Sequence, residues 1–245
     1  MMKFILGKKI EMTQKFMPDG TVVPVTVVNA GPCFISQIKN IDKDGYAAVQ
    51  IGYGEKKKLN KAQTGHLKGL NNLRNLVEFD IAADKVTYEK GQIITVGVFA
   101  KGDIANVIGV SKGKGFQGVI KRHGFHGHNR THGTKDQERR SGSVGSIEPG
   151  HTFRGTRMSG RMGGGQVTIK NLEIIDIDEK NNLLFIKGAI PGCRNGLVEI
   201  IAPGEMKLEK EEKNIKDEEK PVEKKEEIKP GVEKKEEVKQ EAEAQ

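Results

Sequence analysis

"QVTIKNLEIIDIDEKNNLLFIKGAIPGCRNGLVEIIAP", at residues 166–203, contains three apolar segments that are separated by turn residues. The segments are VTIKNLEIIDID, LLFIKGAI and LVEIIAP, and the turns between them are EKNN and PGCRNG. Apolar runs that recur every 8–12 residues or so, with Gly, Pro and Asn between them, are typical of a β-sandwich or a closed barrel. This stretch therefore predicts a mainly β fold and leaves both architectures open.

The first hundred residues show the same pattern. TVVPVTVVN, at residues 21–29, places Val23, Val25 and Val27 on one face of a strand, because strand side chains alternate. CFISQI and YAAVQIGY surround the turn DKDG and predict a hairpin. GQIITVGVFA and ANVIGV predict two further strands of the same body.

Residues from about 60 to 90 depart from this pattern. Leu67, Leu70, Leu73 and Leu76 are spaced by three, which indicates a short helix, although a glycine and two asparagines among them weaken it. We expect a small mixed insertion here.

Residues 111–165 have no strand pattern and an unusual composition. This window holds 14 Gly, 11 Lys and Arg, three acidic residues and five of the six His, so its net charge is +8. Ordering a backbone costs on the order of 1–2 kcal/mol per residue, and the few apolar side chains of the window cannot offset that cost by packing on one another. We expect it to be disordered alone, or ordered by a polyanionic partner.

The charge of the chain is unevenly distributed. Residues 205–245 contain 15 acidic and 11 basic residues, a net charge of −4. Because the whole chain has a net charge of +8, the other 204 residues carry +12. VEKKEEIKPG and VEKKEEVKQE form a near-repeat in this tail. Mixed charge with few apolar residues predicts a disordered, solvated extension, with a helical interaction tail as the alternative.

The cysteines and the N-terminus indicate the compartment. Cys33 and Cys193 are far apart and outside any CxxC pattern, which favours reduced thiols in the cytoplasm. Phe4, Ile5 and Leu6 form an apolar run that is too short for a signal-peptide core or a membrane span. We expect a soluble cytoplasmic protein.

Two cofactor chemistries compete for the glycine-rich window. Gly113, Gly115 and Gly118 match the spacing of a dinucleotide fingerprint, but that motif needs a following helix and an acidic residue about 20 positions on. The sequence that follows, rich in glycine and basic residues, does not predict an amphipathic helix, and no βαβ pattern repeats. The glycines are better explained as positions where the backbone approaches another surface.

The second chemistry is metal binding by His123, His126, His128 and His132. Structural zinc sites usually include cysteine, and no thiol or carboxylate lies within this cluster. A His-rich metal-binding β-barrel protein is the alternative function, and no cofactor is predicted for the preferred one.

The glycine-rich window offers no candidate catalytic residues. GGQ at residues 164–166 matches the catalytic tripeptide of peptide-release factors, but it directly precedes a predicted strand and is explained as a turn. The window contains no Ser/His/Asp or Cys/His arrangement, so we expect no enzyme.

Nucleic-acid binding explains most of the window. Its cations would neutralise phosphates, its glycines would allow close approach, and Phe116, Phe125 and Phe153 supply rings on which bases can stack.

Eight stretches together resemble one family, that of bacterial large ribosomal subunit protein three. They are GKKIEMTQKF, VPVTVVNAGPCFISQIKN, DGYAAVQIGYG, KGKGFQGVIKRHGF, THG, RRSGSVGSIEPGHTFRG, MSGRMGGGQVTIKNLEII and NLLFIKGAIPG, within about residues 3–203. The resemblance implies a closed β-barrel like those of translation factors, and a long extension that penetrates ribosomal RNA towards the peptidyl-transferase centre.

The resemblance also implies a role and partners. The family binds large-subunit ribosomal RNA early in assembly, has no catalytic activity and lies beside large-subunit proteins fourteen and nineteen, in cytoplasmic ribosomes. We therefore expect a barrel body at residues 1–111 and 166–204, with the insertion at about 60–90, an RNA-penetrating extension at 112–165 with its tip near 145–154, and the tail at 205–245.

The predicted RNA-binding residues are cationic, imidazole or phenyl side chains of the extension. They are Lys112, Lys114, Phe116, Lys121, Arg122, His123, Phe125, His126, His128, Arg130, His132, Arg139, Arg140, His151, Phe153, Arg154, Arg157 and Arg161.

Overall fold

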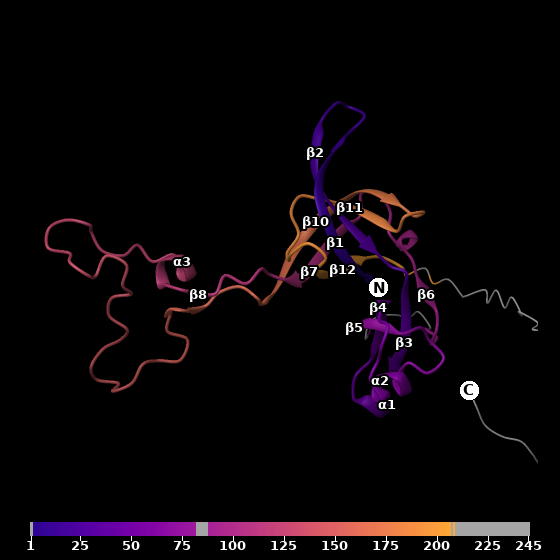
Figure 1. Cartoon of the computed structure of the whole chain (residues 1–245), viewed down its shortest axis with the longest axis horizontal. Coiled ribbons are helices and arrows are strands. Elements are labelled where there is room, and N and C mark those ends of the chain that lie inside the picture. Colours follow the sequence, from indigo (N-terminus) through magenta and orange to yellow (C-terminus); the bar gives the residue numbers. More distant parts are fainter. Residues whose placement is uncertain (1, 82–87, 207, 209–245) are drawn as a thin grey trace, which may run out of the picture. The chain divides into compact units, whose positions relative to one another are not determined.

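The computed structural model describes residues 2–81, 88–206 and 208. Within these residues the secondary structure is mainly β, which confirms the predicted class. The strands form a six-stranded ring, a separate four-stranded sheet and a two-stranded ladder (Figure 1).

The six-stranded ring is a closed barrel in which every strand pairs with two others and every pair is antiparallel. In order around the ring its strands are β1 (Met2–Phe16), β12 (Leu197–Pro203), β7 (Ile104–Val110), β10 (Gln166–Asp178), β11 (Leu183–Lys187) and β2 (Val22–Ala30). The three strands predicted from residues 166–203 are therefore confirmed as β10, β11 and β12. Closure leaves no barrel strand as an edge for pairing with another chain.

Strand β1 is covered on both faces over its first half. Phe4, Ile5 and Leu6 are consecutive and fully buried, which is the burial expected of a continuous apolar run in a strand packed on both sides. The Phe4 ring stacks on Phe79 of the second sheet with the ring centroids 4.6 Å apart. One continuous core thus joins the barrel to the second sheet.

The second sheet has the strand order β5-β4-β3-β6. Its strands are β3 (Cys33–Lys39), β4 (Ala48–Glu55), β5 (Leu73–Asp80) and β6 (Ile93–Ile94). The predicted hairpin is confirmed as β3 and β4, with the short helix α1 (Ile41–Asp44) in its turn. The hairpin belongs to this second sheet and not to the barrel, which corrects the predicted barrel body. The chain leaves β2 through Gly31, whose φ of +75° turns it away, and a cis Gly31–Pro32 bond.

The helix expected from the leucine spacing is wrong in its position. The helix of this region is α2 (Lys61–His66), and Leu73 and Leu76 lie in β5, which pairs with β4. Leu73 packs directly over Gly52, where an added Cβ would overlap its side chain. Pairing in the sheet therefore overrides the helical spacing.

The strand predicted from GQIITVGVFA is also shorter than expected. Only β6 forms within it, and the 3₁₀ helix η1 (Val96–Val98) follows and buries Val96 and Val98. Val96 and Val98 are therefore buried by a helical turn and not by a strand.

The core continues beyond the predicted end of the body. Met206 is 7% exposed and Leu208 packs against the core, although the sequence analysis assigned both to the tail. The rest of the predicted tail lies outside the described residues. No helix among the described residues is long and apolar enough to cross a membrane.

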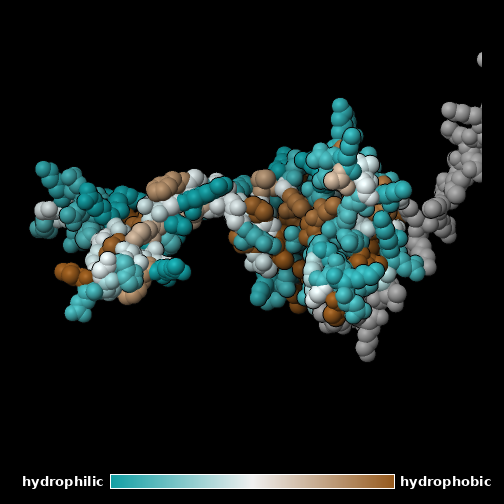
Figure 2. All heavy atoms as spheres, turned by 90° about the horizontal axis from the view of Figure 1, so that it is seen from below, coloured by the Kyte–Doolittle hydropathy of each residue, from teal (hydrophilic) through white to brown (hydrophobic). Residues whose placement is uncertain are grey.

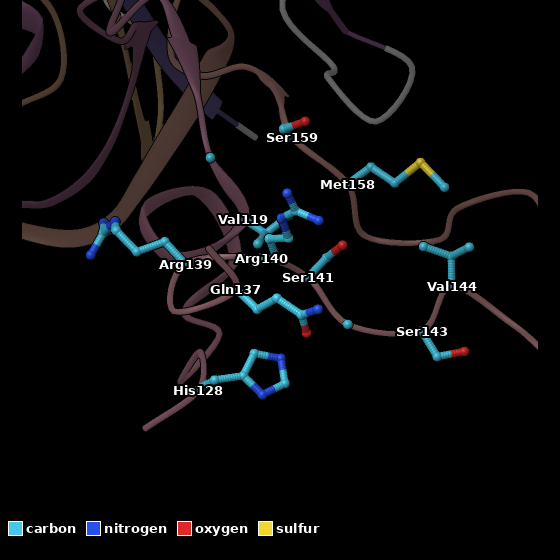
Figure 3. Close-up of a pocket in the computed structure, with 12 residues that line it drawn as sticks. Val119, His128, Gln137, Arg139, Arg140, Ser141, Ser143, Val144, Met158 and Ser159 are labelled. Atoms are coloured by element: carbon cyan, nitrogen blue, oxygen red, sulfur yellow. The ribbon is translucent and has the colours of Figure 1, made fainter. Parts of the chain in front are cut away.

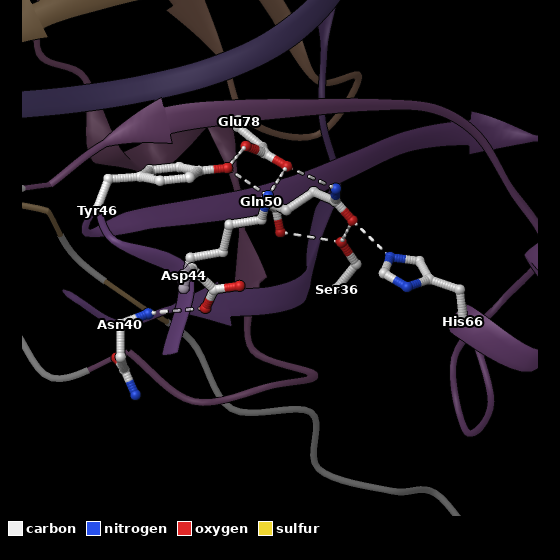
Figure 4. Close-up of polar contacts among 8 residues, drawn as sticks. Ser36, Asn40, Asp44, Tyr46, Gln50, His66 and Glu78 are labelled. Atoms are coloured by element: carbon white, nitrogen blue, oxygen red, sulfur yellow. Dashed lines mark hydrogen bonds and ion pairs between the residues drawn. The ribbon is translucent and has the colours of Figure 1, made fainter. Parts of the chain in front are cut away.

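A polar network covers the exposed face of the second sheet (Figure 4). The Lys39 ammonium lies 2.9 Å from a Glu78 carboxylate oxygen, and the Tyr46 hydroxyl donates to the other oxygen at 2.9 Å. The Gln50 amide donates to Glu78 at 3.1 Å, and its oxygen lies 2.7 Å from Nε2 of His66. The network thereby joins side chains of β3, β4, β5 and α2, and the Glu78 carboxylate lies at its centre.

Candidate nucleic-acid interface

The extension, called the arm below, consists of residues 112–165 between β7 and β10 (Figure 1). Val110 at the end of β7 pairs with Gln166 at the start of β10. The arm therefore leaves and re-enters the barrel at directly opposed positions of two neighbouring strands.

The two ends of the arm form a hydrogen-bonded stem. The Ser111 amide donates to the Gly165 carbonyl at 2.9 Å, and the Lys114 amide donates to the Met162 carbonyl at 2.9 Å. Further out, β8 (Phe116–Gln117) pairs with β9 (Gly160–Arg161). The stem continues the barrel's antiparallel geometry and directs both legs of the arm together.

The stem requires glycine at one position. Gly163 has a φ of +71°, and a Cβ there would collide with the carbonyl oxygen of Lys112 on the opposite leg. The conformation and the close approach of the two legs both exclude a side chain.

A short helix, α3 (Val119–His123), follows the stem. It ends at Gly124, which is left-handed with a φ of +75°. The Arg122 guanidinium donates to the Met158 carbonyl at 2.7 Å and ties α3 to the returning leg. The prediction that no helix follows the glycines is therefore wrong: a short helix forms, and Val119 at its start is buried.

Beyond α3 the outgoing chain is held to residues 137–140. The His128 amide donates to the Glu138 carbonyl at 2.9 Å, and Nε of Arg130 lies 3.0 Å from the Glu138 carboxylate. Gly127 lies against the same carbonyl with a φ of +77°. Glu138, one of the three acidic residues of the arm, therefore pairs with a cation of the arm itself.

The predicted binding residues are mostly exposed. Arg122, His123 and Phe125 are half-buried, and the other fifteen are exposed. Phe116 is 76% exposed and Phe153 is 60% exposed. In the view of Figure 2 the arm presents mainly hydrophilic residues, whereas apolar residues gather on the body. Exposed phenyl rings among cations can stack on bases while the cations neutralise phosphates.

Two histidines of the arm make local contacts with backbone carbonyls. Nε2 of His123 lies 3.0 Å from the Met158 carbonyl, and Nδ1 of His151 lies 2.6 Å from that of Pro149. Among the described residues, no three His, Cys, Asp or Glu side chains are placed to hold a metal ion together. The metal-binding alternative thus gains no support. The dinucleotide interpretation gains none either, because the strands beside the glycines pair antiparallel rather than in a βαβ unit.

The root of the arm is positively charged. Lys9 of β1 donates to the Ile190 carbonyl at 2.9 Å. Burial, and to a lesser degree the charge of Lys112, lowers the pKa of the Lys9 ammonium. Lys9 and Lys112 thus place two lysines near the point where the arm leaves the barrel.

Sequence reasoning missed a second cationic site on the body. Lys8, Arg74, Asn75 and Asn195 line one hollow, and the Lys8 ammonium lies 5.8 Å from the centre of the Tyr53 ring. These residues come from β1, β5 and the turn before β12, so only the fold brings them together. No local sequence signal marks them.

Comparison with known proteins gives close relatives. The large ribosomal subunit protein uL3 of Roseiflexus sp. is 49% identical over 203 residues, which are 81% of this chain and 96% of that protein. The uL3 protein of Chlorobium phaeobacteroides is 50% identical over 81% of this chain and 97% of its own length. The uL3 protein of Natranaerobius thermophilus is 47% identical, with 82% and 97% covered.

A β body that carries a long, exposed, cationic arm defines a class of proteins that assemble with a polyanion. The family model for ribosomal protein L3 matches residues 55–225. The chain belongs to the ribosomal protein L3 family. It is therefore a structural component of the large ribosomal subunit, not an enzyme, and it serves translation on the ribosome, which in bacteria is cytoplasmic.

Proposed function

We propose that this chain binds large-subunit ribosomal RNA chiefly through the arm. The observation that carries the proposal is the arm's composition in its folded form. Its net charge is +8, and Val119 is the single buried residue of the arm, all of which the structure describes. A segment of 54 residues that buries one side chain has no core of its own, so its ordering energy must come from a partner.

In the proposed mechanism the barrel and the arm have different roles. The translation-factor-like barrel anchors the chain on the subunit, and the arm lies along RNA with its cations on phosphates and its rings on bases. Because such binding needs only RNA, the chain can join early in subunit assembly. The tip, residues 145–154, extends towards the peptidyl-transferase centre, and large-subunit proteins fourteen and nineteen are the neighbours of the body.

Salt dependence of RNA binding tests the proposal. If about five of the arm's eleven cations contact phosphates, log affinity against log salt concentration should have a slope of about −3.5 to −4.5. The measurement uses the full chain and protein-free large-subunit RNA. Replacing residues 112–164 by an Asn-Gly turn should remove most of that slope, and an unchanged slope would contradict the proposal.

A charge-matched pair of variants separates the arm from net charge alone. Gln in place of Arg154, Arg157 and Arg161 removes three exposed cations of the arm. Gln in place of Lys56, Lys57 and Lys58 removes three exposed cations of the body. If all three arginines are among the contacting cations, the arm variant should flatten the slope by about 2–3 units and the body variant by much less. Equal effects would indicate nonspecific attraction.

A further inference from the structure

The arm contains a pocket that has no role in the proposed phosphate contacts (Figure 3). It lies between α3, the turn at residues 137–144 and the returning leg, and its volume is about 700 Å³. Its lining includes Val119, His128, Gln137, Ser141, Val144 and Met158. A volume of this size lies within the usual range for small-molecule and cofactor sites.

Backbone contacts hold the walls of the pocket. Arg122 binds the Met158 carbonyl and so fixes the returning leg against α3. The His128 amide donates to the Glu138 carbonyl, and the Arg140 amide donates to the Gln137 carbonyl at 3.1 Å, which fixes the turn on the other side. These bonds join α3 to the returning leg and the chain after α3 to the turn.

The lining suits the parts of a nucleotide. The exposed side chains of Val144 and Met158 supply apolar surface for the face of a base, and the His128 ring and the Gln137 amide extend from the opposite side in Figure 3. An imidazole and an amide can bond the edge of a base, and an amide does so as both donor and acceptor.

The charge of the lining favours the same ligand. Arg139 and Arg140 belong to it, and none of its residues, all of which are described, is acidic. Figure 3 shows the Arg139 side chain directed away from the space, where it can reach a phosphate outside the pocket. Arginine guanidinium groups bind phosphate through paired hydrogen bonds.

We propose that this pocket receives one unstacked nucleotide of the RNA along which the arm lies. The base enters beside Val144 and Met158, its edge meets His128 and Gln137, and its phosphate stays outside with Arg139. The inference rests on the proposed RNA binding and adds a specific contact to it, because single-stranded bases are recognised when they are splayed out of the stack.

Chemical probing of the complex tests the pocket. Protein-free large-subunit RNA is bound by the full chain, and the 2′-hydroxyl acylation of each nucleotide is measured with and without protein. Ser141→Trp fills the pocket, and Ser146→Trp places the same side chain on the exposed arm outside it. The first variant should return one nucleotide, or a run of two or three, to its protein-free reactivity and weaken binding about tenfold. The second should do neither.

A second variant guards against a misfolded arm. Gln137→Leu keeps the volume of the side chain and removes its hydrogen bonds to the base edge. It should change the reactivity of the same nucleotides that Ser141→Trp changes. If the two variants change different nucleotides, or none, while the chain still binds RNA, the pocket proposal is overturned and RNA binding stands. If the unmodified chain fails to bind the RNA, both proposals fall.

Discussion

At the scale of single residues, the stem of the arm depends on glycine. Gly163 combines a positive φ with a backbone contact across the two legs, whereas Gly113 on the opposite leg has open space around its would-be Cβ. The two positions are close in the stem and differ in backbone conformation and in the space around a Cβ atom. They form a matched pair for testing whether the stem positions the arm.

We expect Gly163→Ala to open the stem and Gly113→Ala to leave it intact. An L-residue in the left-handed region costs about 1–2 kcal/mol, and the clash with Lys112 adds to this cost. Amide exchange at Lys114 and Met162, which bond across the stem, should become faster in the first variant only. Equal exchange rates in the two variants would show that the stem does not depend on Gly163.

At the scale of elements, the second sheet is joined by a carboxylate that responds to pH. The hydrogen bond from the Lys39 ammonium lowers the pKa of Glu78, and the bond from Tyr46 adds to the effect. A carboxyl whose pKa is lower in the folded state stabilises the fold above its unfolded pKa. That stability is lost as the pH falls through the folded value.

We therefore expect acid to weaken the second sheet through Glu78. Between pH 7 and about 4.3, the ordinary pKa of Glu, the contribution should be constant, and below that range it should decline. Urea unfolding at a series of pH values measures it. In Glu78→Gln the urea midpoint should be lower at neutral pH and should fall less between pH 4.5 and 2.5. A parallel fall in both proteins would assign the acid response to other groups.

The arm is the element whose order depends most on its surroundings. It buries one residue, so its amides beyond the stem are protected only by a few hydrogen bonds between its own segments. In the free protein we expect residues 125–157 to exchange their amide protons far faster than β1, β7 or β10. Binding to large-subunit RNA should slow that exchange. Protection in the free protein as strong as that of the barrel strands would contradict this expectation.

At the scale of the whole molecule, the core is built without residues of the arm. The buried cluster that joins the barrel to the second sheet includes no residue of the arm. We expect the variant in which an Asn-Gly turn replaces residues 112–164 to unfold cooperatively, with a thermal midpoint within about 4 °C of the full chain. Ile200→Val, which removes a methyl group from the fully buried side chain, provides the comparison with an expected loss of about 0.5–1.5 kcal/mol. Loss of a cooperative transition in the arm-free variant would show that the arm supports the core.

Much of this organisation could be predicted from local patterns. The three strands after residue 165, the hairpin around DKDG and the extent of the region without regular strands all follow from alternation and turn residues. The second sheet could not be predicted, because β3 and β4 have the same local pattern as barrel strands. Their separation from the barrel depends on the turn at Gly31 and on packing between Phe4 and Phe79, which are distant in sequence.

The candidate site was predictable to a similar degree. Charge and glycine content locate the arm and its exposed cations without any structure. The pocket was missed because Val119, Gln137 and Met158 come from three segments of the arm, and none of them carries a charge that would mark it. Lys8 and Arg74 were missed for the same reason, since only the fold brings β1 and β5 together.

The pairing of Val110 with Gln166 has a consequence for the evolution of the chain. Both ends of the arm are already neighbours in a hairpin, so residues can be gained or lost between them without changing the register of any barrel strand. The arm is in effect an insertion in a hairpin of the barrel. The length of the arm can therefore change to match the partner that it enters. The same insertion, with its stem, could be placed in a hairpin of an unrelated protein.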